Sequence, residues 1–191
     1  MGCAPDPFGA SSEERLASAM GDTSSADSGD ELTAEDLAAL QQYACGEAAG
    51  RLEKANTAEN ESEKLTMLVN LVRTLRADRQ GREAIFDRRP GLRYHQGVAA
   101  DGMTYDIPSL ETACKNAISG AEDALDDFLR DLISGGLVIE EYKKVGRKRT
   151  SVASARVDFA KVREAIDVLA PTDSDALYKA LRQAEERLKE N

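Results

Sequence analysis

The chain has 191 residues, of which 41% are hydrophobic and only 5% aromatic, and it contains no Trp. This length suffices for one domain with a sizeable aliphatic core, or for two very small domains. No run of about 18 apolar residues occurs, which excludes a membrane-spanning helix, and we expect a cytoplasmic protein.

The negative charge is concentrated near the N-terminus. The net charge is −10 overall, but residues 1–64 hold 4 Lys/Arg and 14 Asp/Glu, whereas residues 65–191 hold 21 of each. The acidic composition therefore does not argue against nucleic-acid binding by the C-terminal two-thirds. Residues 1–31 are rich in Ser, Asp and Gly with few bulky apolar side chains, which predicts a disordered acidic tail.

The residues that usually carry site chemistry are few and scattered. Cys3, Cys45 and Cys114 show no CxxC spacing, and His95 is the only histidine, whereas a zinc site needs about four ligands. We expect free thiols in a reducing compartment, no metal and no cofactor. No phosphate-binding glycine motif occurs either, so the sequence predicts a protein that is not an enzyme.

The first structured segment begins at Thr33. This residue is predicted to cap a helix over residues 34–55, because Glu35 and Asp36 then lie in the first turn, where the helix dipole favours negative charge. The polar residues 56–63 are predicted to form a linker or the N-terminal turn of the next helix.

The strongest helical pattern follows this linker. A wide apolar face starts at Leu65 and repeats with helical spacing to about Phe86. Residues 87–102 contain several glycines and predict a loop with a short strand near 92–98. An alternating pattern over 103–107 predicts a second strand.

Two helices are predicted next. Pro108 and Ser109 are typical of a helix start, and this helix is expected to end near Ile118. Ser119 and Glu122 have the spacing of a capping box, which predicts a second helix over 121–134. Gly135–Gly136 would end it.

The C-terminal third contains a predicted hairpin and two helices. Alternating apolar residues over 137–145 and 153–159 predict two strands joined by a basic turn at Gly146–Arg149. A helix is predicted over 160–169. A last amphipathic helix carries a heptad-like seam made of Leu177, Leu181, Ala184 and Leu188.

The element order between residues 65 and 169 resembles a winged helix-turn-helix domain. The stretch LETACKNAISGAEDALDDFLRDLISGGLVIEEYKK carries the resemblance, with a turn at Ile118–Ser119 and a Gly136–Leu137 step before the wing. The resemblance implies a mainly α fold with a small β-hairpin wing (α+β) and extra N- and C-terminal helices. The predicted segments are an acidic tail (1–31), a helix and linker (32–63), the winged-helix domain (64–170) and a C-terminal amphipathic helix (171–191).

The third helix departs from the pattern of DNA-binding winged helices. In such domains this helix reads the major groove with Arg, Asn or Gln and contacts phosphates with Lys or Arg. Here its outward residues are mostly acidic, and their carboxylates would repel phosphates. They are Glu122, Asp123, Asp126, Asp127 and Asp131, accompanied by Arg130.

The wing has the opposite charge. Lysines on an edge strand often serve only to prevent aggregation, but the density of charge in KKVGRKR favours contact with a polyanion. This polyanion is double-stranded DNA, the chain's own acidic tail, or the acidic helix of a second copy. The predicted DNA-binding residues are Lys143, Lys144, Arg147, Lys148, Arg149 and Arg156, with Arg88, Arg89 and Arg93 as auxiliary contacts.

Two functions remain open at this point. The first is a winged-helix regulator of transcription or replication that contacts duplex DNA mainly through phosphate and minor-groove contacts of its basic wing. The second is a winged-helix protein-interaction module or adaptor that uses the acidic third helix and does not bind DNA. Likewise, the C-terminal seam either packs on its own domain or forms a homodimer.

Overall fold

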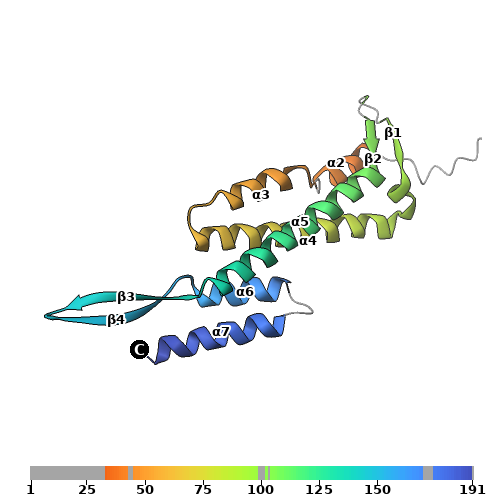
Figure 1. Cartoon of the computed structure of the whole chain (residues 1–191). Helices are drawn as coiled ribbons and strands as arrows, with labels where there is room; N and C mark the ends of the chain where they lie inside the picture. Colours follow the sequence, from red (N-terminus) through yellow and green to blue (C-terminus); the bar gives the residue numbers. More distant parts are fainter. Residues whose placement is uncertain (1–32, 43–44, 99–101, 103, 170–173, 191) are drawn as a thin grey trace, which may run out of the picture.

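The computed structural model describes residues 33–42, 45–98, 102, 104–169 and 174–190. The predicted acidic tail and Cys3 lie outside these residues. The molecule is elongated, with two long helices, α4 (Glu61–Arg88) and α5 (Ile107–Ser134), packed against each other along its length (Figure 1).

Helix α4 supplies much of the core. It begins at Glu61, within the segment predicted as a linker or N-terminal turn, because the Asn60 side chain accepts hydrogen bonds from the backbone N–H groups of Ser62 and Glu63, at 2.8 and 3.3 Å. This is an N-cap, which satisfies donors that have no partner within the helix. The predicted apolar face is confirmed, and its buried members include Leu65, Leu68, Val69, Leu71, Val72 and Leu75.

The predicted turn at Ile118–Ser119 is wrong, because α5 continues unbroken through it. Gly120 within a helix costs about 1 kcal/mol relative to Ala. The apolar side chains on either side outweigh that cost, since Ile118 and Ala121 are 4% and 1% exposed and each buried aliphatic side chain contributes about 1.5–3 kcal/mol. The two expected helices are therefore one helix of 28 residues.

The predicted N-terminal helix is broken into three pieces. These are α2 (Ala34–Gln42), the 3-10 turn η1 (Cys45–Glu47) and α3 (Ala48–Asn56), and α3 packs against α4. The predicted cap is confirmed, because the backbone N–H of Asp36 donates to the Thr33 hydroxyl at 3.1 Å.

The expectation of free thiols is wrong for two of the three cysteines. Cys45 and Cys114 form a disulfide that joins η1 to α5 across 69 residues of sequence. Cys114 is fully buried and Cys45 is 8% exposed. The bond covalently fixes the N-terminal helices to the central pair.

The end of the molecule that carries α2 has a small sheet of its own. The 3-10 turn η2 (Pro90–Tyr94) leads into β1 (Gln96–Val98), which pairs antiparallel with β2 (Thr104–Asp106). Both short strands were predicted from the sequence. A separate apolar cluster underlies this end and consists of Leu40, Ile85, Phe86, Leu92 and Ile107.

The opposite end carries a hairpin, as predicted, but its bounds differ: the second strand spans Lys148–Ala155 instead of 153–159, and the turn is Gly146–Arg147 instead of Gly146–Arg149. Strands β3 (Val138–Val145) and β4 (Lys148–Ala155) pair antiparallel, with Val138 opposite Ala155 and Val145 opposite Lys148. The hairpin projects away from the helices (Figure 1). Helix α6 (Phe159–Leu169) follows and packs against α4 and α5.

The C-terminal seam is buried within its own chain, so its proposed role as a dimer surface is not supported. Helix α7 (Ser174–Lys189) packs against α5, α6 and both strands of the hairpin. Leu177, Leu181 and Ala184 are 8%, 1% and 6% exposed, and Leu188 is partly buried. The apolar stripe thus completes the core.

The coarse fold prediction, a mainly helical protein with a small β-hairpin, is confirmed; a second small hairpin accompanies it. Within the described residues, no helix is both long and apolar enough to cross a membrane.

Candidate functional site

The tip of the β3–β4 hairpin is a tight turn formed by Gly146 and Arg147 between the paired residues Val145 and Lys148. Gly146 has φ +65°, the left-handed conformation that two-residue hairpin turns require and that glycine adopts without steric cost. This turn places Arg147 at the apex of the ribbon.

The cations next to the turn lie on both faces of the ribbon. Lys144 is directly opposite Arg149, and Lys148 is one residue away on the same strand as Arg149. Because successive residues of a strand point to opposite faces, Lys144 and Arg149 share one face and Lys148 lies on the other. Two like charges directly opposite each other destabilise a strand pair, so the isolated hairpin bears an electrostatic cost that an anion would relieve.

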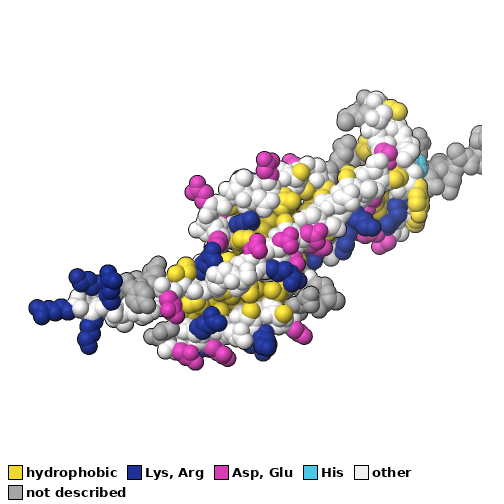
Figure 2. All heavy atoms as spheres, in the orientation of Figure 1, with side chains coloured by type: hydrophobic (Ala, Val, Ile, Leu, Met, Phe, Trp, Pro, Cys, Tyr) yellow, Lys and Arg dark blue, Asp and Glu magenta, His cyan; other side chains and the backbone are white. Residues whose placement is uncertain are grey.

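The tip is exposed and far from the acidic surface of the body. Lys144, Arg147, Lys148 and Arg149 are all exposed, and Figure 2 shows positive side chains gathered at this end with acidic ones on the helices. Across the described portion of the chain, no carboxylate forms an ion pair with any of the four. Their charge therefore faces solvent.

Lys143 and Arg156 differ from these four. Lys143 lies in β3 opposite Thr150, and only its backbone is described. Arg156 follows β4 at the base of the hairpin, where its guanidinium pairs with Glu61 at the start of α4 and donates to the Gly135 carbonyl oxygen at 3.2 Å. These contacts give Arg156 a structural role at the hairpin base and separate it from the tip.

The auxiliary cations proposed from the sequence do not belong to this surface. Arg88, Arg89 and Arg93 lie at the end of α4 and in η2, at the opposite end of the molecule from β3–β4 (Figure 1). Arg89 pairs with Asp36, and Arg93 pairs with Glu83 at 2.6 Å. The ion pairs of Arg89 and Arg93 stabilise that end of the fold, and none of the three arginines can act together with the hairpin tip.

The acidic residues of α5 are partly neutralised. Glu122 pairs with Arg76 of α4 at 2.8 Å, and Asp126 pairs with Arg130 at the same distance. Asp123, Asp127 and Asp131 remain exposed at four-residue intervals. They form one stripe along the C-terminal half of α5.

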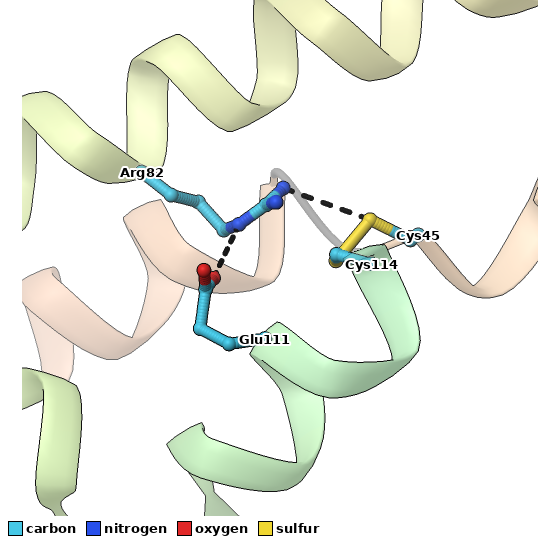
Figure 3. Close-up of a disulfide and its surroundings, with 4 residues drawn as sticks. All are labelled: Cys45, Arg82, Glu111 and Cys114. Carbon is cyan, nitrogen blue, oxygen red and sulfur yellow. Dashed lines mark hydrogen bonds and ion pairs between the residues drawn. A yellow bond between two sulfur atoms is a disulfide. The ribbon is translucent and has the colours of Figure 1, made fainter. Parts of the chain in front are cut away.

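A buried charged cluster that the sequence did not predict lies beside the disulfide (Figure 3). Arg82 of α4 is 1% exposed, its Nε donates to Glu111 of α5 at 2.6 Å, and its Nη1 lies 3.6 Å from the Cys45 sulfur. Arg82 lies seven residues after Leu75, on the same core-facing side of α4. This helical spacing is the feature of the sequence that could have predicted its burial. The cluster ties α4, α5 and η1 together, and we assign it a structural role.

Comparison with protein-family models, curated protein sequences and solved structures gives no match. The function must therefore be argued from the residues of this chain alone.

Proposed function

We propose that the protein binds duplex DNA, without catalysing a reaction, through the basic tip of the β3–β4 hairpin. The observation that carries the proposal is the set of four exposed cations around one turn, Lys144, Arg147, Lys148 and Arg149, with no carboxylate paired to them in the described residues. A regulator of transcription or replication is the class of protein that this activity fits.

Duplex DNA suits the site because its charge is dense. It carries one phosphate charge per about 1.7 Å of helix axis, so several phosphates can surround a narrow tip at once. Binding would also relieve the repulsion between Lys144 and Arg149, which are opposite each other. A lysine on an edge strand serves to prevent aggregation, but four exposed cations around one turn exceed that need and favour a ligand.

We also propose that the domain is a variant of the winged helix in which the hairpin serves as the wing. The order α4, β1–β2, α5, β3–β4 and α6 supports this interpretation. The continuous α5 provides no separate recognition helix, and its exposed stripe is acidic. The hairpin therefore makes the main DNA contact.

The test is duplex binding measured by fluorescence anisotropy in about 0.1 M salt. Each phosphate contact contributes about 0.9 decades of affinity at this salt concentration, so Arg147→Ala/Lys148→Ala/Arg149→Ala should lose about 10²- to 10³-fold. The matched control, Arg51→Ala/Lys54→Ala/Arg79→Ala, removes three exposed cations from α3 and α4. Equal losses in both variants would contradict the proposal.

The alternative is a protein-interaction module that uses the acidic stripe of α5. The observation that favours it is the exposure of Asp123, Asp127 and Asp131, which a basic partner surface would complement. If the full chain binds no duplex even at about 20 mM salt, where electrostatic binding is strongest, the DNA proposal fails and this alternative gains support.

A further inference from the structure

We infer that the hairpin enters the major groove of DNA tip-first, with Arg147 directed at the base edges on the groove floor. This inference rests on the proposed DNA binding and makes it more specific. It differs from the expectation drawn from the sequence, in which a wing touches phosphates and the minor groove.

The dimensions of the ribbon select the groove. The axes of paired strands lie about 5 Å apart, and a sheet is roughly 10 Å thick through its side chains. The major groove of B-DNA is about 12 Å wide, whereas the minor groove is about 6 Å wide. A two-stranded ribbon with long side chains on both faces therefore fits the major groove of undistorted B-DNA but not its minor groove.

The exposed part of the hairpin is long enough to reach the groove floor. On β4, Lys148, Arg149 and Thr150 are exposed, whereas Ser151 to Ser154 are partly buried, and α7 packs against this strand. Three residues at about 3.4 Å each extend about 10 Å beyond the body, before the turn is added. The major groove is about 8.5 Å deep, so the helical body does not prevent full insertion.

The distribution of cations fits a groove with two phosphate walls. Lys144 and Arg149 lie on one face of the ribbon and Lys148 on the other. A ribbon that lay flat on one DNA strand would present one of these faces to solvent. Inside the groove, each face meets the phosphates of a different strand, so cations on both faces are used.

The apex residue then meets the bases. Arg147 is in the two-residue turn and is exposed, so it is the first side chain to reach the groove floor. Arginine donates two hydrogen bonds to O6 and N7 of guanine, the commonest specific contact in the major groove. We therefore expect a preference for sites that contain guanine.

The experiment compares two duplexes of identical sequence, one with guanine and one with 7-deazaguanine. The replacement removes the N7 acceptor from the major groove and leaves base pairing, the minor groove and the phosphates unchanged. The full chain should bind the 7-deazaguanine duplex about tenfold more weakly, as expected for losing one hydrogen bond to a charged donor. Arg147→Ala has no donor at this position, so it should bind both duplexes within about twofold of each other.

Each outcome is informative. Equal binding of both duplexes by the wild-type chain would overturn the groove assignment and leave the proposed DNA binding intact. Displacement by netropsin, which occupies the minor groove of A/T-rich DNA, would overturn it as well. Binding of neither duplex at low salt would instead refute the proposed function, so the two failures are distinguishable.

Discussion

Reduction of the Cys45–Cys114 disulfide should destabilise the protein substantially. The bond spans 69 residues of sequence, and the loop-closure entropy that it removes from the unfolded chain corresponds to about 4 kcal/mol at 25 °C. Disulfides typically contribute about 2–4 kcal/mol, which is a large part of the 5–15 kcal/mol of a typical domain. Since reduction adds only two hydrogen atoms, it leaves core packing nearly unchanged and isolates this contribution.

Urea unfolding followed by circular dichroism at 222 nm measures the effect. With an m-value of about 2 kcal/mol/M, reduction by a phosphine should lower the midpoint by about 1–2 M. A Cys45→Ala/Cys114→Ala variant serves as the control, because its midpoint should not respond to the reductant. Thiol titration of the oxidised, urea-unfolded chain should give one free thiol, since two of the three cysteines are paired.

Two results would refute this reasoning. Three titratable thiols in protein purified without reductant would show that the bond does not form. An unchanged urea midpoint after complete reduction would show that the bond contributes nothing to stability.

Three further predictions concern the fold. Leu181→Ala should cost about 2–4 kcal/mol of unfolding free energy, because Leu181 is 1% exposed within its own chain. Light scattering should give the same mass for the wild-type protein and the variant. If the wild-type protein were a dimer that the substitution converts to a monomer, the seam would be a dimer interface and not part of the chain's own core. Glu111→Ala should cost about 3 kcal/mol, because it takes a carboxylate away from the buried Arg82 guanidinium. The double variant Arg82→Met/Glu111→Met should recover most of that loss in the same urea assay, and no recovery would count against the ion pair as the cause. The hydroxyl of Thr33 donates to the Asp36 carboxylate and lowers its pKa. As the pH falls, the Asp36 carboxylate of the unfolded chain therefore binds a proton before that of the folded chain, so its stabilisation is present above about pH 4 and is lost below it. Asp36→Asn should reduce the fall in melting temperature on acidification below about pH 4. An unchanged fall would contradict a stabilising role for the Asp36 carboxylate.

The sequence predicted correctly those elements for which hydrophobic spacing and local turn or capping residues favour the same structure. The face of α4 repeats with a helical period, and Asn60 caps its start. The β3–β4 hairpin combines alternating apolar residues with a glycine at a turn that needs positive φ. At these places propensity, burial and turn chemistry favour the same structure, which is when a sequence specifies it most clearly.

The predicted break at Ile118–Ser119 is wrong because contacts between residues distant in sequence determine whether the helix continues there. Ser119 and Glu122 have capping-box spacing, and Ile118–Ser119 resembles the turn of a winged helix-turn-helix domain, so the sequence predicts a turn here. The buried stripe of α5, however, continues through this point at helical intervals, with Cys114, Ile118 and Leu125 all facing the core. The burial of α5 side chains against α4 outweighs the local preference for a helix end at Ser119.

The candidate site was predicted in part. Its cations were visible as a cluster in the sequence, but their positions on the two faces depend on the strand register. Arg156 could not be distinguished from them by charge alone, because its partner Glu61 is 95 residues away in sequence. The pairing of Cys45 with Cys114 is non-local in the same way, since three cysteines allow three pairings.

The salt dependence of duplex binding tests the central claim most directly. If Lys143, Lys144, Lys148 and Arg149 each neutralise one phosphate while Arg147 contacts a base, the logarithm of affinity should fall with the logarithm of salt concentration at a slope of about −3 to −4. Replacing Arg147, Lys148 and Arg149 by Ala should reduce this slope to about −1 to −2, and the α3–α4 control variant should keep the wild-type value. A slope that the hairpin variant leaves unchanged would show that the protein contacts DNA elsewhere.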